Sequence, residues 1–374
     1  MRRLMPQHHR RNSAPREHRS SLPRLHRSSR LVPYATACYR CVMKRDRRTR
    51  LIVALLVGCA CGLASWLNTR TPGFGMQDFE AWWLAARAVA QGSDPYVAVG
   101  RVFRSGFLYP LPTALATMPL AWLPATIAGS IFAGLSSAIL AFTVTRTAWW
   151  PLLMCLSGSF VDAVLMAHWS VLLTAALFAP GLVWLGVFKP NVGLGLFAFR
   201  PSWKHAAIIV GIALASLAVM PTWPLEWIET ARASPMHFAP WRVPGGVLLL
   251  LAFVRWRRPE ARFVGVLALM PSSPIAYEAL PLFVIPRRRL EMIILVLLSD
   301  ALLLYVDARA DTHDIAQYFR IAAPAMTWLM YVPAVAMVLS RPNVDPPTRV
   351  ASADCSTAMS LPTSIPARPV AQET

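Results

Sequence analysis

Charged residues are scarce in this chain. Asp, Glu, Lys and Arg together make up 15% of its 374 residues, whereas soluble domains contain about 25%. Hydrophobic residues make up 56%, and apolar stretches long enough to cross a bilayer recur along most of the sequence. This composition excludes a disordered protein and argues against an ordinary soluble enzyme, so it predicts an all-α integral membrane protein.

Several enzyme motifs are also absent. The sequence has no G-x-x-x-x-G-K-S/T phosphate loop, no H-E-x-x-H zinc pair, no G-x-S-x-G nucleophile elbow and no G-x-G-x-x-G nucleotide fingerprint. It has no Asp-x-Asp pair to hold a divalent cation, so neither a metal nor another cofactor is implied. The six cysteines are scattered, and the lone C-x-x-C of Cys38 and Cys41 does not predict a zinc site.

Positive charge is concentrated at the N-terminus. The formal net charge is +19, and residues 1–50 hold 15 Lys and Arg against two acids. A basic tail directly before an apolar run is typical of a cytoplasmic N-terminus, so membrane lipids are favoured as partners over nucleic acid. We interpret residues 1–50 as a basic cytoplasmic tail. An equally good reading takes Met43 and the basic residues after it as the natural start, which makes residues 1–42 an extension.

The apolar pattern predicts a polytopic membrane domain over residues 51–340, with about 10–12 transmembrane or half-spanning helices. Several candidates are shorter than the ~20 residues that a straight span needs. The candidate segments are 51–68, 107–123, 125–145, 148–166, 168–182, 184–199, 205–222, 243–256, a proline-broken hairpin 261–286, 289–306 and 321–340. Residues 341–374 are rich in Pro, Ser, Thr and Ala and are predicted to be a disordered cytoplasmic tail.

The charges between these segments predict a topology. With the N-terminal tail in the cytoplasm, the basic stretches 200–204, 255–262 and 287–289 and the tail after residue 341 also lie inside, as the positive-inside rule requires. The outer side then receives the connections 69–106, 223–242 and 307–320. These three connections hold eight of the 18 acidic residues, which supports the assignment.

The first outer connection contains a predicted amphipathic helix. Residues 78–92 begin with an N-cap type residue, Asp78, continue with good helix formers and end at Gly92. Its apolar face carries tryptophans, which favours a position in the lipid headgroup layer; the residues on this face are Phe79, Trp82, Trp83, Ala86 and Ala90. Asp78 would then lie close to the outer membrane surface. A plain helix cap is the competing role for Asp78.

Three motifs carry a resemblance to a known family. They are Asp78-Phe79 with the turn Gly92-Ser93-Asp94-Pro95-Tyr96, the entry Phe107-Leu108-Tyr109-Pro110-Leu111-Pro112, and an apolar segment that ends in Lys189-Pro190. They resemble the polytopic glycosyltransferases of family 87, which include mannosyltransferases that use polyprenyl-phosphate-mannose and have the GT-C architecture. The resemblance covers residues 51 to about 200. One departure is that this chain reads Ala167-His168 where the family usually shows Gly-Gln.

The resemblance implies a catalytic site. A carboxylate in the first outer loop acts as general base in GT-C enzymes, and Asp78 is the matching position. The leaving lipid phosphate needs cationic donors, for which Arg87, Arg101, Arg104 and Lys189 are candidates, each competing with a role at the lipid interface. Glu80, Tyr109 and His168 complete the candidate substrate contacts, although His168 also fits a helix end. Asp162, Glu278 and Asp300 are intramembrane acids for which pairing within the bundle is expected.

The sequence therefore predicts a hexosyltransferase, most simply a mannosyltransferase, of the bacterial plasma membrane. Its donor would be a polyprenyl-phosphate sugar and its acceptor a glycan or glycolipid on the outer face. A secondary transporter or lipid flippase with an intramembrane relay at Lys189, Asp162 and Asp300 is the alternative. A non-catalytic scaffold in polysaccharide assembly is a third class, if His168 marks lost activity.

Overall fold

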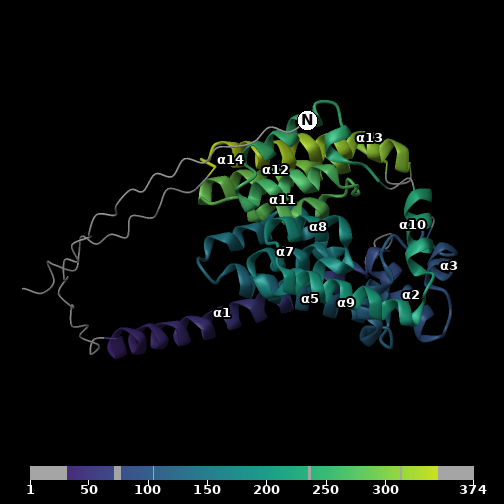
Figure 1. Cartoon of the computed structure of the whole chain (residues 1–374), viewed down its shortest axis with the longest axis horizontal. Coiled ribbons are helices and arrows are strands. Elements are labelled where there is room, and N and C mark those ends of the chain that lie inside the picture. Colours follow the sequence, from purple (N-terminus) through teal and green to yellow (C-terminus); the bar gives the residue numbers. More distant parts are fainter. Residues whose placement is uncertain (1–31, 71–76, 104, 235–236, 312–313, 344–374) are drawn as a thin grey trace, which may run out of the picture. The chain divides into compact units, whose positions relative to one another are not determined.

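The computed structural model describes residues 32–70, 77–103, 105–234, 237–311 and 314–343, with side chains from residue 47 onward. The described elements are helical, and the one β-bridge found among these residues joins Phe238 and Ser272. The predicted all-α class is thus confirmed for the part of the chain described (Figure 1). The chain divides into two compact units, Met1–Arg48 and Thr49–Thr374, and every contact given below lies within the second.

The elements follow one another with short connections. The α-helices are α1 (Val32–Asn68), α2 (Gln77–Ala90), α3 (Pro95–Gly100), α4 (Leu111–Thr117), α5 (Ala125–Val144), α6 (Gly158–Leu165), α7 (Ser170–Phe178), α8 (Pro190–Phe199), α9 (Trp203–Val219), α10 (Trp223–Ala233), α11 (Pro259–Leu269), α12 (Arg289–Arg309), α13 (Ile315–Met326) and α14 (Val332–Leu339). The 3₁₀ segments are η1 (Met118–Leu120), η2 (Trp150–Leu156), η3 (Pro180–Phe188), η4 (Pro240–Arg242), η5 (Gly246–Arg255) and η6 (Ala276–Val284), and the π-helical turn η7 (Thr327–Tyr331) joins α13 to α14.

Three helices among the described residues are long and apolar enough to cross a membrane. They are Arg47–Asn68, Ala125–Val144 and Ala316–Leu339, with 22, 20 and 24 residues. α9 and α10 meet at 99° and count as a fourth span if the bent pair is taken as one. Lengths near 20 residues suit the hydrocarbon core of a bilayer, so the architecture is that of an α-helical membrane protein.

Several predicted spans are built from two shorter helices. The segment 148–166 breaks at Ser157, whose side chain accepts a hydrogen bond from the Phe160 N–H and so caps α6. The segment 184–199 breaks at Lys189, because Pro190 has no N–H to continue η3. The segment 107–123 contains only α4 and η1, and the apolar helix Leu111–Leu120 is too short to cross a bilayer alone.

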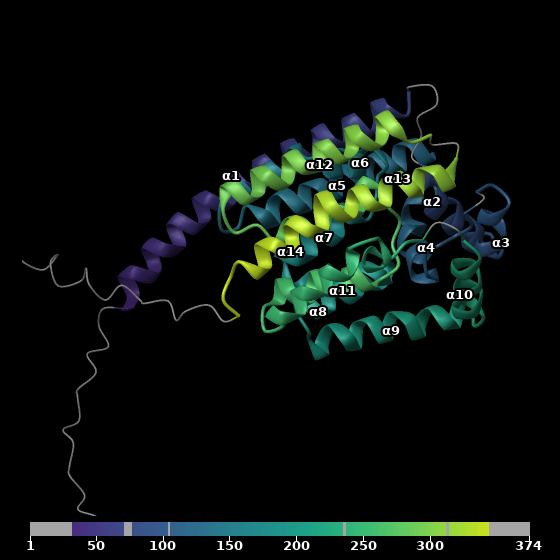
Figure 2. The same ribbon diagram turned by 90° about the horizontal axis from the view of Figure 1, so that it is seen from above.

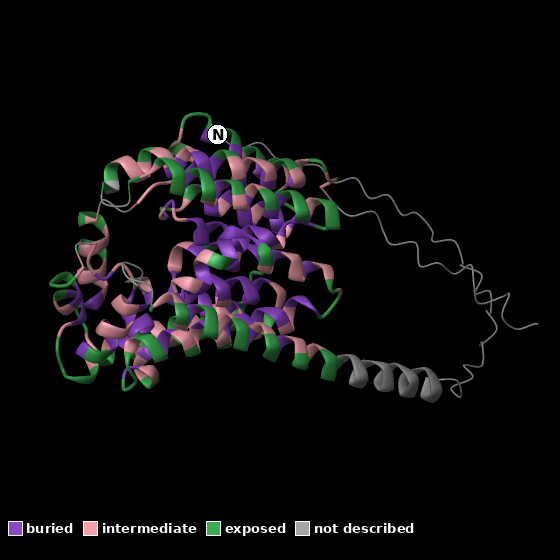
Figure 3. Cartoon of the chain, turned by 180° about the vertical axis from the view of Figure 1, so that it is seen from behind, coloured by how far each residue is buried: buried purple, intermediate pink, exposed green. Residues whose placement is uncertain are grey.

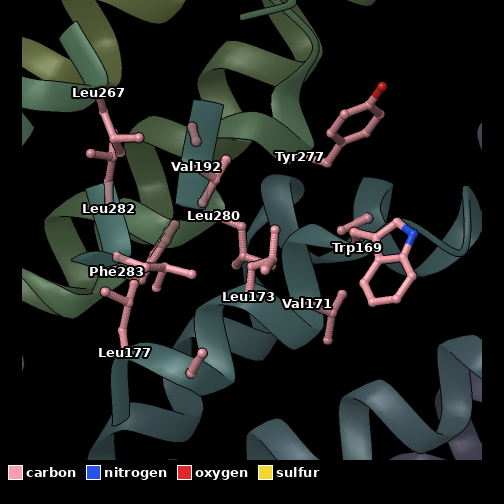
Figure 4. Packing of buried hydrophobic residues seen from close by; sticks show 14 of the residues in the cluster. Trp169, Val171, Leu173, Leu177, Val192, Leu267, Tyr277, Leu280, Leu282 and Phe283 are labelled. Carbon is pink, nitrogen blue, oxygen red and sulfur yellow. The ribbon is translucent and has the colours of Figure 1, made fainter. Parts of the chain in front are cut away.

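The core forms around α7. This helix packs against α5, α6, α8, η3 and η6, and Figure 3 shows buried residues concentrated between these elements while exposed residues cover the outer helices. Figure 4 shows Leu173 and Leu177 of α7 beside Leu280 and Phe283 of η6, all at most 1% exposed. This packing anchors η6, which carries two of the site residues described below.

α1 crosses α5 at a contact made by glycine. Gly58 and Gly62 lie four residues apart on one face of α1, and both approach Gly134 of α5. A Cβ atom on Gly58 would lie 2.8 Å from the Gly134 carbonyl oxygen and 2.8 Å from the Ala138 Cβ. Small residues are what allow membrane helices to approach this closely.

Some of the predicted connections contact one another in the fold. The Arg341 guanidinium contacts Glu291 at 2.6 Å and the Ile285 carbonyl at 2.9 Å, and Arg262 donates to the Ala198 carbonyl at 2.8 Å. Away from these contacts, the Trp227 indole of α10 donates to the Leu108 carbonyl at 3.0 Å. Figure 2 shows α2, α3 and α10 gathered at one end of the bundle.

Candidate functional site

A cavity of about 300 Å³ lies where α2, η3, α8, α10 and η6 meet. Its polar lining includes Asp78, Tyr109, Lys189, Tyr277 and Glu278. The other lining residues are Ser105, Leu108, Pro190, Asn191, Leu194, Trp227, Ala231, His237, Met270, Pro271, Ser272, Ser273 and Ile275. The volume is at the lower end of the ~300–1,000 Å³ typical of small-molecule sites. Three of the sequence-predicted residues, Asp78, Tyr109 and Lys189, therefore share one cavity.

Asp78 lies in the first turn of α2 and points its carboxylate into this cavity. The Tyr277 hydroxyl donates a hydrogen bond to it. Burial raises the pKa of the Asp78 carboxyl above its ordinary value, with a further increase from the charge of Glu278, and the Tyr277 hydrogen bond and the charge of Lys189 offset only part of this. The helix begins at Gln77, so Asp78 lies in the first turn of the helix and not before it.

Trp82 fixes the orientation of α2. It follows Asp78 by one helical turn, is 0% exposed, and its ring centroid lies 5.3 Å from that of Tyr109 and 5.6 Å from that of Trp169. The prediction that the tryptophans of this helix rest in the headgroup layer is wrong for Trp82, because Tyr109, Phe132 of α5 and Trp169 surround its ring inside the protein. This anchor directs the adjacent carboxylate of Asp78 inward.

Lys189 sits at the break between η3 and α8. The two segments turn tightly there because Gly186 and Gly193 touch: a Cβ on Gly186 would lie 2.6 Å from the Gly193 Cα. The Thr113 hydroxyl donates to the Phe188 carbonyl at 2.6 Å and ties this break to α4. The Lys189 side chain is thereby held 6% exposed at the cavity wall.

Lys189 forms a buried ion pair with Glu278. Its ammonium group contacts Glu278 Oε1, an oxygen that also accepts from the Ser273 hydroxyl at 3.3 Å. Lys189 Nζ lies 5.6 Å from the ring centroids of both Tyr109 and Tyr277, within the range of cation–π attraction. Glu278 is only 4% exposed, so the pair is almost fully removed from solvent. Pairing was the expected role of Glu278, and this expectation is confirmed.

His168 completes the polar cluster. Its Nε2 lies 3.0 Å from both Lys189 Nζ and the Tyr109 hydroxyl oxygen, its Nδ1 lies 2.8 Å from Ser170 Oγ, and its ring stacks on that of Tyr277 with 3.8 Å between centroids. Donors face both ring nitrogens, because the Lys189 ammonium lies against Nε2 and the Ser170 N–H lies 3.1 Å from Nδ1. His168 is thus buried beside Lys189, and it also lies at a helix end, between α6 and α7, as one reading of the sequence expected.

The residue before His168 has an unusual backbone. Ala167 has φ of 49°, in the left-handed region that favours glycine. The His168 N–H donates to the Ala163 carbonyl at 2.8 Å and closes the C-terminus of α6. The resemblance places glycine at this position, so the departure in sequence falls where a side chain costs conformational energy.

The turn Asp94-Pro95-Tyr96 contacts the backbone of Tyr109. Asp94 caps α3 by accepting from the N–H groups of Tyr96 at 2.7 Å and Val97 at 3.2 Å. The Tyr96 hydroxyl then donates to the Tyr109 carbonyl at 3.3 Å, and the rings of Tyr96 and Phe107 lie 5.5 Å apart. These two sequence motifs therefore meet in the structure, next to the cavity.

The other predicted contacts lie elsewhere. Glu80 is half-buried on α2 outside the cavity lining, and Arg101 is exposed at the end of α3. Arg87 is exposed with its guanidinium 4.8 Å from the Trp83 ring; nine residues after Asp78, it projects from the opposite side of α2. Arg104 lies outside the described residues. Lys189 is accordingly the only Lys or Arg among the described residues that line the cavity.

Two residues of the site have partners that a single sequence does not reveal. Tyr277 was not among the predicted contacts, and Glu278 was expected only as a structural acid. Asp162 accepts from the Tyr277 N–H at 3.1 Å and thereby holds the start of η6. Asp300 accepts from the Gly158 N–H at 2.6 Å, at the start of α6. The proline-broken segment around an intramembrane acid was the available signal for this region.

Comparisons of the chain with protein-family models, curated proteins and solved structures find no match. The chemistry of the cavity is therefore the basis for function. It offers a carboxylate with a raised pKa, a buried ammonium group, and two tyrosine rings in a space that suits a small ligand. Such a set can remove a proton from a ligand at one end and stabilise an anion at the other.

Proposed function

We propose that this protein is an integral-membrane glycosyltransferase with a GT-C-like fold. It moves a hexose, most simply mannose, from a polyprenyl phosphate to a glycan or glycolipid acceptor at the outer face of a bacterial plasma membrane. The observation that carries the proposal is that Asp78 and Lys189, the base and the cation implied by the resemblance, line the same cavity.

Asp78 acts as the general base. Its carboxylate takes the proton of the acceptor hydroxyl as the hydroxyl oxygen bonds to the anomeric carbon of the donor sugar. The bond between that carbon and the phosphate oxygen breaks, and polyprenyl phosphate leaves with the electron pair. A base with a raised pKa is better matched to this task near neutral pH than an ordinary aspartate, and such catalysis contributes about 10²–10⁴ in rate.

Lys189 stabilises the leaving phosphate. An ammonium group has three N–H donors, and two of those of Lys189 have partners among the described residues, Glu278 and His168. The third is available to a phosphate oxygen in the cavity. In a buried site a fixed cation acts strongly on developing negative charge because solvent screening is weak.

A direct experiment uses purified protein in proteoliposomes with radiolabelled polyprenyl-phosphate mannose and a total glycolipid extract. The wild type should transfer label to the glycolipid fraction and release polyprenyl phosphate. Asp78→Asn should abolish both, whereas Glu80→Gln, a neutralisation two residues away and outside the cavity, should retain them. Equal activity of Asp78→Asn and the wild type would remove the proposed base.

The same vesicles separate this proposal from a transporter or flippase. Movement of the lipid-linked sugar across the bilayer without any release of polyprenyl phosphate would favour the relay hypothesis. That hypothesis has weaker support from geometry, because Asp162 and Asp300 each accept a backbone N–H at the start of a helical segment.

A further inference from the structure

One oxygen of the buried ion pair has no partner. Glu278 Oε1 accepts hydrogen bonds from the Lys189 ammonium group and from the Ser273 hydroxyl. Glu278 Oε2 is also buried, and it has no hydrogen-bond partner among the described residues. Buried polar atoms are nearly always satisfied, and an unsatisfied carboxylate oxygen is costly. Because Glu278 lines the cavity, whatever occupies the cavity is in a position to supply the missing donor.

The surroundings restrict what that donor is. Asp78 is near enough to Glu278 for the charge of Glu278 to raise the pKa of Asp78, and the cavity holds these two carboxylates and one ammonium group. The paired ammonium is fully used by its protein partners and the leaving phosphate. Oε2 therefore needs a hydrogen-bond donor from the occupant of the cavity, and within the proposed function the donors on the substrate are sugar hydroxyls.

We propose that Glu278 is a specificity-determining residue whose Oε2 accepts a hydrogen bond from one ring hydroxyl of the transferred hexose. This proposal rests on the proposed function, since it assigns the sugar of the donor to this cavity. Oε1 holds the Lys189 ammonium group in position for the phosphate, and Oε2 accepts the hydrogen bond from the sugar hydroxyl. One side chain thereby couples recognition of the sugar to the position of the cation.

The size of the effect follows from the chemistry of an unpaired acceptor. A sugar that fills the cavity and excludes water without offering a hydroxyl at Oε2 leaves a buried carboxylate oxygen unpaired. Sites built to bind a hydroxyl reject the analogue that lacks it. A penalty of the usual size for such a group corresponds to roughly ten- to a hundredfold weaker binding of the deoxy analogue.

The test is a panel of polyprenyl-phosphate mannoses that each lack one hydroxyl, at position 2, 3, 4 or 6 of the sugar. Binding to the purified wild type is measured by competition with the labelled parent compound, and transfer is measured separately. One member of the panel should bind roughly ten- to a hundredfold more weakly than the parent. This measurement on the wild type needs no variant to fold.

The variant Glu278→Gln then assigns the effect to its residue. The amide oxygen can still accept from Lys189, but the amide nitrogen in place of Oε2 cannot accept from a hydroxyl. Glu278→Gln should bind the parent compound more weakly than the wild type does. It should bind the weakly bound deoxy analogue as the wild type does, so that the difference in affinity between the two compounds disappears. Asp300→Asn, which neutralises a carboxylate outside the cavity, should retain it.

Each outcome decides between the two proposals. Discrimination that depends on Glu278 but occurs without transfer would support the role of Glu278 and overturn the transferase. Transfer without discrimination, or equal weakening of all analogues by Glu278→Gln, would overturn the role of Glu278 and leave the transferase standing. Failure of the wild type to bind any member of the panel would overturn both.

Discussion

The ion pair between Lys189 and Glu278 makes the sharpest stability prediction. The two side chains are 7% and 4% exposed, so removal of one partner leaves a charge that water cannot solvate. We expect Lys189→Met to reduce the free energy of unfolding by about 3–5 kcal/mol, the range for breaking a buried pair. The upper part of the range applies here because Asp78, a second carboxylate, loses the same cation.

A double variant isolates the cause. Lys189→Met with Glu278→Met replaces both charges by apolar side chains of similar length, and replacement of a whole buried pair is often neutral or stabilising. The double variant should therefore be more stable than Lys189→Met alone. Unfolding is followed by titration with denaturing detergent in mixed micelles. The coupling between the two positions is obtained from the double-mutant cycle.

A pair with one exposed partner provides the control. Arg287 contacts Glu260 at 2.8 Å, but the Arg287 side chain is 43% exposed and Arg341 also lies 4.0 Å from Glu260. Arg287→Met should therefore cost no more than about 1 kcal/mol. The reasoning fails if Lys189→Met is as mild as Arg287→Met, or if the effects of the two single substitutions at positions 189 and 278 simply add.

Three further predictions concern single residues, each measured by the same unfolding assay. Gly58→Ala should destabilise the protein by about 1–3 kcal/mol, because the added methyl group clashes with α5. Gly211→Ala, in open space on α9, should stabilise the protein by about 0.5–1 kcal/mol. Equal effects of the two substitutions would contradict the close crossing of α1 and α5. Ala167→Gly should stabilise by up to about 1 kcal/mol, because it relieves a left-handed backbone, and a loss of more than that would refute strain there. Asp78→Asn should be more stable than the wild type at pH 8, because a raised carboxyl pKa means that the ionised group opposes folding; this advantage should shrink as the pH falls through the raised pKa, and an advantage that grows on acidification would contradict the sign.

Local sequence signals predicted the regular helices well. The predicted segment 125–145 is α5 at Ala125–Val144, and the predicted helix 78–92 is α2 at Gln77–Ala90 with Gly92 just beyond it. These elements follow from periodicity, capping and composition, which act over a few residues. The breaks at Ser157 and Lys189 were not predicted, because contacts between distant segments stabilise them. Asp300, which accepts from the Gly158 N–H, and the Thr113 hydroxyl, which donates to the Phe188 carbonyl, make two such contacts.

The site was predicted only in part, because its residues come from segments that lie far apart in the sequence. Lys189 stood out from the sequence because a lysine in an apolar segment is costly without a partner. Its partner, Glu278, follows 89 residues later, and one sequence contains no information that pairs them. Arg87 was a candidate on charge alone. Helical geometry places it half a turn away from Asp78 after two full turns, which is why the structure leaves it outside the cavity.

The pH dependence of transfer by the wild type and Asp78→Asn tests the central claim most directly. Single-turnover transfer from polyprenyl-phosphate mannose by the wild type should rise with pH through an apparent pKa above the ~3.9 of a free aspartate, because the base must lose its proton before it can act. Asp78→Asn should be slower by about 10²–10⁴ and lack this rise. A variant that retains both the rate and the pH profile of the wild type would show that Asp78 is not the base.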